Sequence, residues 1–167
     1  MNLLKLIILI AILTAKASFS FSQSSLEDVF KKYNKGIVPI ITVEDLASAS
    51  NDMIILDTRE PNEYRISYIK NAIPVGFNHF NINQFIENHS NKEKEIVVYC
   101  SIGVRSEIIG EKLQKAGYIN VKNLYGGIFE WKNNNFPVYN LKNKETDSVH
   151  AYSKEWSKWL KKGIKVY

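Results

Sequence analysis

The chain has 167 residues, 45% of them hydrophobic, and carries 22 Lys and Arg against 17 Asp and Glu, a net charge of +5. This length suits one domain with small additions, and the composition is that of a folded globular protein rather than a disordered or fibrous one. The charge is small, and no stripe of basic residues alternates with aromatic ones, so nothing indicates a nucleic-acid partner.

The first 17 residues have the pattern of a secretory signal peptide. Lys5 precedes an apolar run at 6–13, and Ala15-Lys16-Ala17 is a small-x-small cleavage site, with later cleavage up to Gln23 left open. The run is shorter than the roughly 20 residues of a membrane span, so we expect a periplasmic or secreted protein with no stable membrane span after processing. An uncleaved anchor is the alternative. Loss of Lys5 and Lys16 leaves 20 basic and 17 acidic residues, a net charge of +3.

Strands and helices are expected to alternate along most of the remaining chain. Residues 24–36 place apolar side chains at helical spacing, which predicts an N-terminal helical extension. The expected strands are 37–41, 53–57, 96–99 and 121–124, and the expected helices are one from Thr42 to about Ser50, one beginning at Pro61, 81–89, 107–116 and one holding Trp131. This alternation over residues 37–138 predicts an α/β domain with a mostly parallel sheet of about five strands, flanked by helices.

The single cysteine, Cys100, directly follows the buried strand expected at 96–99. A loop of small residues and a helix come next, so backbone N–H groups and the helix dipole are directed at the loop. A thiol in that position has a lowered pKa and exists partly as thiolate. Exported chains usually pair their cysteines, and an unpaired one therefore favours a reactive thiol over a buried structural cysteine.

Residues 139–167 form a C-terminal extension. Five apolar residues recur at helical spacing with lysines between them: Val149, Tyr152, Trp156, Trp159 and Leu160. This spacing predicts a short amphipathic helix. We expect the helix to pack its Trp face onto the domain, and contact with membrane lipid is the alternative.

The segment Cys100–Ser106 resembles the active-site loop of the rhodanese family of sulfurtransferases, in which Cys is followed by two variable residues, Gly, one variable residue, Arg and a small residue. Two further segments resemble the family. Asp57-Thr58-Arg59 with Glu63-Tyr64 is similar to its Asp-x-Arg-x-x-x-Glu-Tyr signature, and residues 117–131 are similar to its Gly-aromatic-x-x-Val-x-x-Leu-x-Gly-Gly-x-x-x-Trp pattern. The turn at 68–74 departs from the family pattern, because Tyr68 replaces a His and Lys70-Asn71 replaces Pro-Gly.

The resemblance implies one rhodanese-like domain over 37–138 that moves a sulfane sulfur from thiosulfate or a persulfide to a thiophilic acceptor through a Cys100 persulfide. The implied binding loop consists of Ser101, Ile102, Gly103, Val104, Arg105 and Ser106. Asp57 and Arg59 are expected to support this loop, Asp57 by accepting hydrogen bonds and Arg59 by pairing with a carboxylate. Two roles stay open for Arg105: it positions an anionic donor, or it locks the loop by pairing with a carboxylate.

Other functions stay open beside sulfur transfer. A rhodanese-like domain can serve as a sulfur carrier or a protein-interaction module without turnover. A phosphatase is disfavoured because four residues separate Cys100 from Arg105, where five do so in the related phosphatase loops, and an arsenate reductase lacks its second cysteine here. No cofactor or metal is expected, since His79, His89 and His150 have no ligand spacing. The expected partners are a small-molecule or protein sulfur donor and a thiol acceptor, and the protein is expected to be a monomer.

Overall fold

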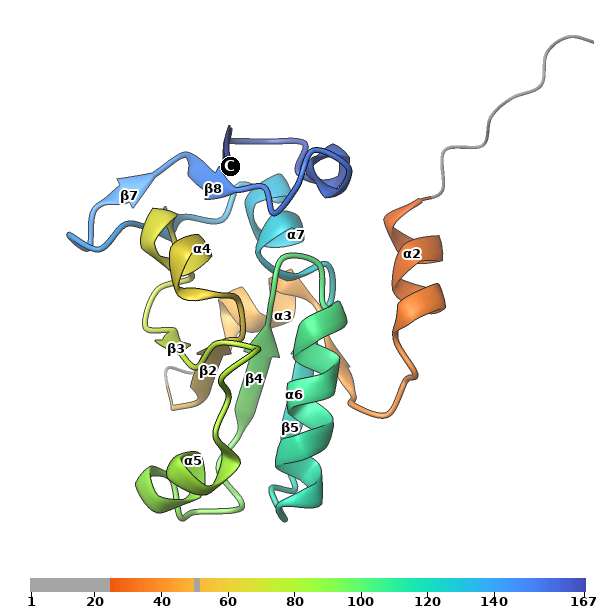
Figure 1. Ribbon diagram of the computed structural model, residues 1–167, viewed down its shortest axis with the longest axis vertical. Helices are drawn as coiled ribbons and strands as arrows, with labels where there is room; N and C mark the ends of the chain where they lie inside the picture. Colours follow the sequence, from red (N-terminus) through yellow and green to blue (C-terminus); the bar gives the residue numbers. More distant parts are fainter. Residues whose placement is uncertain (1–24, 50–51) are drawn as a thin grey trace, which may run out of the picture.

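A computed structural model describes residues 25–49 and 52–167, so the predicted signal peptide lies outside the described residues. The chain is arranged around a five-stranded sheet (Figure 1). Its strands are β1 Ile40–Ile41, β2 Ile54–Asp57, β3 Ile73–Pro74, β4 Ile96–Tyr99 and β5 Val121–Leu124. The strand order is β1-β5-β4-β2-β3 and every neighbouring pair is parallel, which confirms the predicted α/β architecture.

Six α-helices lie among the described residues. They are α2 Leu26–Tyr33, α3 Val43–Ser48, α4 Pro61–Ile66, α5 Ile82–Asn88, α6 Val104–Lys115 and α7 Gly127–Asn133. Local sequence explains their starts: the Thr42 hydroxyl caps α3 by accepting from the Asp45 N–H at 3.1 Å, and Pro61 opens α4, where its missing N–H costs nothing. Helix α6 begins three residues earlier than Glu107, because left-handed Gly103 already caps it.

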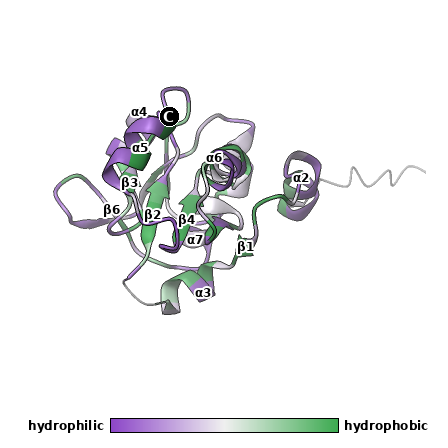
Figure 2. Cartoon of the chain, turned by 90° about the horizontal axis from the view of Figure 1, so that it is seen from below, coloured by the Kyte–Doolittle hydropathy of each residue, from purple (hydrophilic) through white to green (hydrophobic). Residues whose placement is uncertain are grey.

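The side chains of the central strand β4 alternate between two apolar layers. Val97 and Tyr99 pack with side chains of α3 and α7 on one face, while Ile96 and Val98 pack with side chains of α5 and α6 on the other. All four are completely buried. Figure 2 shows the apolar strands β2 and β4 enclosed between the helices. This packing holds the carboxyl end of β4, where Cys100 follows, in a fixed position.

The prediction of a C-terminal amphipathic helix is wrong. The segment instead forms β8 Ser148–His150, paired in parallel with β9 Ile164–Val166, and a single 3-10 turn at Trp156–Trp159, after a hairpin of β6 Val138–Tyr139 and β7 Glu145–Thr146. The backbone groups that a helix would use are committed elsewhere, because the Ala151 N–H donates to the Val166 carbonyl and Tyr152 has φ +64°.

The apolar side chains of this extension nevertheless pack onto the domain. Val149, Trp159 and Leu160 are buried in the core layer that includes α7. Figure 1 places β8 at the end of the molecule where α4 and α7 lie. Within the described residues, no helix is both long and apolar enough to cross a membrane.

Candidate active site

The sulfur of Cys100 lies inside a loop that turns back onto it. The loop joins the end of β4 to the start of α6, and its turn is made by Gly103 at φ +99°. The Gly103 N–H donates to Cys100 Sγ at 3.1 Å. A Cβ at this position would lie 2.6 Å from the Phe30 ring and 3.2 Å from the Leu124 carbonyl oxygen. Only glycine therefore combines this backbone angle with such close neighbours.

The thiol of Cys100 is 1% exposed but electrostatically favoured as thiolate. Burial alone would raise its pKa, yet the positive charge of Arg105 and hydrogen bonds from Ser106 and Ile102 more than offset that effect, and the pKa of Cys100 lies below its ordinary value. This is the direction that the strand-loop-helix position predicts.

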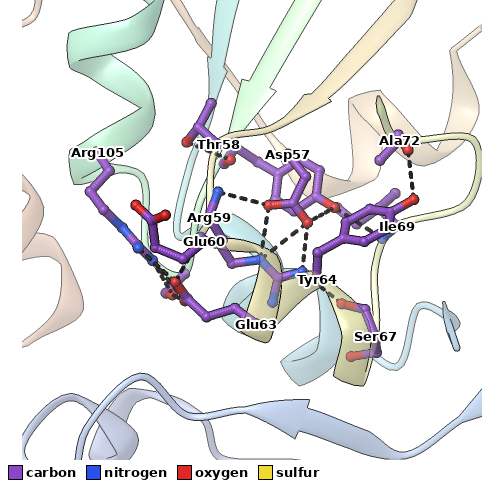
Figure 3. Close-up of polar contacts among 12 residues, drawn as sticks. Asp57, Thr58, Arg59, Glu60, Glu63, Tyr64, Ser67, Ile69, Ala72 and Arg105 are labelled. Atoms are coloured by element: carbon purple, nitrogen blue, oxygen red, sulfur yellow. Dashed lines mark hydrogen bonds and ion pairs between the residues drawn. The ribbon is translucent and has the colours of Figure 1, made fainter. Parts of the chain in front are cut away.

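Arg105 forms a two-point ion pair with Glu63 of α4. Its Nη1 donates to Oε2 at 2.7 Å and its Nη2 to Oε1 at 2.8 Å. The Ser101 hydroxyl joins them, accepting from Arg105 Nη2 at 3.0 Å and donating to Glu63 Oε1 at 3.1 Å (Figure 3 draws Arg105 facing Glu63). The sequence left two roles open for Arg105, and the structure shows one of them, the pairing with a carboxylate.

Glu63 is 2% exposed and still ionised. Burial would raise its pKa, but the bonds from Arg105 outweigh burial and keep the pKa of Glu63 below its usual range. Sequence reasoning placed Glu63 in the signature without connecting it to the loop. A signal was present, because α4 and the Cys100 loop follow the carboxyl ends of two neighbouring parallel strands, β2 and β4. An acidic residue in the first turn of α4 therefore lies at the same edge of the sheet as Arg105.

Asp57 and Arg59 form a fully buried ion pair that contacts Tyr99, the residue before Cys100. Arg59 Nε donates to Asp57 Oδ1 at 3.0 Å, and Arg59 Nη2 donates to Asp57 Oδ2 and to the Ser67 carbonyl, each at 2.6 Å. The Tyr99 hydroxyl donates to the same carboxylate at 2.6 Å (Figure 3 shows the Asp57 and Arg59 contacts). The expected pairing of Arg59 with a carboxylate is thus present, and it reaches the loop through Tyr99 rather than through the sulfur.

Asn123 of β5 ties the other side of the loop to the sheet. Its side-chain oxygen accepts from the Ser106 hydroxyl at 2.7 Å, and its amide nitrogen donates to the Gly103 carbonyl at 2.8 Å and to Glu107 Oε2 at 3.2 Å. Asn123 is completely buried. Sequence reasoning missed it, because Lys122 next to it makes the strand half polar and only the buried position of Asn123 distinguishes the two residues.

The start of α7 holds the carbonyl groups of the same loop. The Ile128 N–H donates to the Cys100 carbonyl at 2.9 Å, and the Phe129 N–H donates to the Ser101 carbonyl at 3.1 Å. This approach requires Gly127, at φ +54°, because a Cβ there would lie 2.2 Å from the Cys100 carbonyl oxygen. The loop is therefore held by three elements: β5 and α7 bind its backbone, and α4 binds the side chains of Ser101 and Arg105.

A small open pocket of about 90 Å³ leads to Cys100. It is lined by Cys100, Ser101, Ile102, Val104, Arg105, Tyr152 and Trp156. Five of the seven predicted site residues of the Cys100–Ser106 loop thus meet at the pocket, while Gly103 and Ser106 lie behind it in hydrogen bonds to the sulfur and to Asn123. Among residues 25–49 and 52–167, no group of three or more His, Cys, Asp or Glu could hold a metal ion.

Known proteins resemble this chain in sequence. The model of the Rhodanese-like domain family matches residues 42–134, more than half of the chain. The tRNA uridine(34) hydroxylase of Aster yellows witches'-broom phytoplasma (strain AYWB) is 34% identical over 88 residues, which cover 51% of this chain and 29% of that protein. The chain therefore spans less than a third of the length of that relative.

Two solved structures have the same fold. A rhodanese-related protein from Thermoplasma volcanium is 27% identical and superposes with a TM-score of 0.50, covering 60% of this chain and 96% of that one. A thiosulfate sulfurtransferase from Pseudomonas aeruginosa is 23% identical with a TM-score of 0.56, covering 74% of this chain and 23% of that one.

Proposed function

Because the chain belongs to the Rhodanese-like domain family, we propose that it is a sulfurtransferase that carries a sulfane sulfur as a Cys100 persulfide. One observation carries this proposal: a thiol of lowered pKa lies at the end of an open pocket, with the Gly103 N–H donating to its sulfur. The same arrangement suits the outer sulfur of a persulfide, which is an anion and is stabilised by backbone N–H groups and by a nearby positive charge.

In the first half-reaction the Cys100 thiolate attacks the sulfane sulfur of thiosulfate or of a persulfide. A new S–S bond forms, the donor's own bond to that sulfur breaks, and the remainder of the donor departs with the electron pair. Arg105 contributes its positive charge at this stage, while its bonds to Glu63 keep the loop in position.

In the second half-reaction an acceptor thiolate attacks the outer sulfur of the persulfide. The bond to Cys100 breaks and Cys100 departs as thiolate, which its lowered pKa favours. A sulfur carrier or interaction module is the alternative. A carrier would load Cys100 in the same way but release the sulfur only to a protein partner, whereas an interaction module would not load it.

We also propose that the protein acts outside the cytoplasm as a monomer. The signal-peptide pattern of residues 1–17 supports export. Transfer RNA, which the name of the phytoplasma relative specifies, is not proposed as a substrate here. The chain matches only a part of that relative, and its small net charge does not favour nucleic-acid binding.

The proposal is tested by intact mass of the purified protein after incubation with thiosulfate, with inorganic polysulfide and with a low-molecular-weight persulfide. We expect a gain of one sulfur atom that cyanide removes, and no gain in the Cys100→Ser variant. Absence of added sulfur with all three donors, in a folded protein with a reduced thiol, would replace sulfur transfer by an interaction module.

A further inference from the structure

The C-terminal extension completes the pocket over Cys100. Tyr152 and Trp156 line it, and both lie outside the residues that match the family model. The Trp156 ring packs between two others: its centroid lies 6.4 Å from that of Tyr152, edge to face, and 6.0 Å from that of Tyr33 in α2. Both extensions of the domain therefore contribute to one row of aromatic rings, in which Tyr152 and Trp156 line the pocket and Tyr33 packs behind Trp156.

Tyr152 and Trp156 are held firmly in this position. The Tyr152 N–H donates to His150 Nδ1 at 3.1 Å, directly after strand β8. The guanidinium carbon of Arg105 lies 4.8 Å from the centroid of the Tyr152 ring. Tyr152 also has φ +64°, which is rare for an aromatic residue, and such strained backbone is concentrated at functional sites. Trp156 is fixed by its own packing, because the 3-10 turn that it opens ends in buried Trp159.

The chemistry of this lining disfavours a strongly anionic donor. Arg105 is the only positively charged side chain among the pocket residues that the structure describes, and its guanidinium is already bonded to Glu63 and Ser101. The thiosulfate dianion would lose its water there without a free cation to replace it, which is costly. An apolar group would instead gain by covering the aromatic surface.

We propose, building on the sulfur transfer above, that this pocket selects sulfane-sulfur donors that carry an apolar organic group on the atom bonded to the reacting sulfur, and that Tyr152 and Trp156 set the preference. The pocket volume of about 90 Å³ is roughly three times the share of one liquid water molecule. It accommodates the reacting sulfur and the first atoms of the organic group. The aromatic row supports the rest of that group toward the surface.

Three donors isolate the organic group: thiosulfate, methanethiosulfonate and benzenethiosulfonate. Each carries the same sulfane sulfur on a sulfonyl centre. The third substituent of that centre is an oxygen anion in thiosulfate, a methyl group in methanethiosulfonate and a phenyl ring in benzenethiosulfonate. Attack by the Cys100 thiolate forms the persulfide, breaks the bond between the two donor sulfurs and expels sulfite or the corresponding sulfinate with the electron pair. The second-order rate constant of persulfide formation is measured for each donor, and we expect benzenethiosulfonate to react fastest with the natural protein.

The donors differ in intrinsic reactivity, so variants provide the decisive comparison. Trp156→Ala removes one ring, and Tyr152→Asn removes the other with a residue that tolerates the left-handed backbone. We expect each to lower the ratio of the benzenethiosulfonate to the thiosulfate rate constant about tenfold, the size of one lost aromatic contact. Tyr167→Ala, an exposed tyrosine of the same extension away from the pocket, should leave the ratio unchanged.

Two results would overturn the inference. One is an unchanged ratio in both folded variants, and the other is a faster reaction with thiosulfate than with benzenethiosulfonate in the natural protein. If none of the donors forms a persulfide, the proposed function fails, and the preference of the pocket is then tested by measuring binding affinities alone. Calorimetric titration of Cys100→Ser with benzenesulfinate and with sulfite should then show tighter binding of benzenesulfinate, reduced about tenfold when Trp156→Ala is added.

Discussion

Arg105 acts on two neighbours at once, since it pairs with Glu63 and lowers the pKa of Cys100. The two effects are compatible because the ion pair is nearly enclosed, with side-chain exposures of 15% for Arg105 and 3% for Glu63, and enclosed charges are weakly screened. Glu63 therefore orients the guanidinium, and the oriented charge still stabilises the thiolate. Changing either partner separates these contributions.

Replacing Arg105 should raise the pKa of Cys100. In Arg105→Met the positive charge is lost while burial and the loop hydrogen bonds stay, so the remaining effect of burial moves the pKa of the thiol upward. Thiolate absorbance, followed against pH, should rise at lower pH in the natural protein than in the variant. Arg105→Lys, which keeps a charge, should fall between them. A variant that titrates at the same pH as the natural protein would contradict the role of Arg105.

Replacing Glu63 should destabilise the protein. Glu63→Gln keeps the size of the side chain but leaves Arg105 as an uncompensated buried charge, which costs about 3 kcal/mol. Urea unfolding at neutral pH measures the loss. The surface pair Lys115–Glu111 provides the control, and Glu111→Gln should leave the free energy of unfolding nearly unchanged.

The same variant has a defined pH dependence. The pKa of Glu63 is lower in the folded protein than in the unfolded chain, so its ionisation stabilises the fold above the unfolded pKa of about 4.3, and this contribution is lost as pH falls through the folded pKa. The stability difference between the natural protein and Glu63→Gln should therefore shrink below about pH 4. A difference that stays constant from pH 7 to pH 3 would show that the pair is not the cause.

At the level of helices and strands, local sequence patterns were sufficient to predict an element where its residues favour one type of secondary structure clearly. The apolar run 96–99, the following glycine-containing loop and the apolar positions of α6 predict a strand, a turn and a helix, and these occur with only the start of α6 displaced. The C-terminal segment was misjudged because apolar spacing of three and four residues also suits a strand, a turn and a 3-10 helix in succession. The pairing of β8 with β9 and the left-handed Tyr152 leave no local mark in the sequence.

The centre of the site was predictable from the sequence, whereas only Asp57 and Arg59 were predicted among the residues that support it. Cys100 and its loop are contiguous, so the resemblance of this one segment to the rhodanese active-site loop was enough to identify them. Glu63 and Asn123 reach the loop from positions 42 and 20 residues away from the groups they bind, and only the order of strands in the sheet brings them there. Contacts of this kind depend on tertiary packing, which periodicity does not encode.

The contact between α7 and the Cys100 loop should depend on one glycine. Gly127→Ala would force a Cβ to within 2.2 Å of the Cys100 carbonyl oxygen in addition to the cost of φ +54°, so we expect a loss of about 3 kcal/mol and reduced persulfide formation. Gly117 is a matched control, at φ +93° with open space around it, and Gly117→Ala should cost only about 1 kcal/mol. Equal losses in the two variants would mean that backbone angle alone, and not the close approach, determines the cost.

Taken as a whole, the molecule encloses its reactive loop between the two extensions of the domain. Helix α2 places Phe30 against Gly103 and Tyr125, while the C-terminal extension places Tyr152 and Trp156 at the pocket. Figure 1 shows α2 and the C-terminal extension as separate segments around the body that holds the sheet. Residues outside the family match thus shape both the rear of the loop and its opening.

This enclosure predicts that α2 controls access to Cys100. Phe30 is buried and closes the rear of the loop, so Phe30→Ala should lower stability by about 3 kcal/mol and let the loop open locally. Alkylation of Cys100 by a bulky maleimide should then accelerate at constant pH. Tyr33→Ala, on the same helix but 47% exposed, should cost less than about 1 kcal/mol. If Phe30→Ala lowers stability without changing the alkylation rate, α2 stabilises the domain but does not hold the loop closed, because only local opening next to the sulfur changes its accessibility.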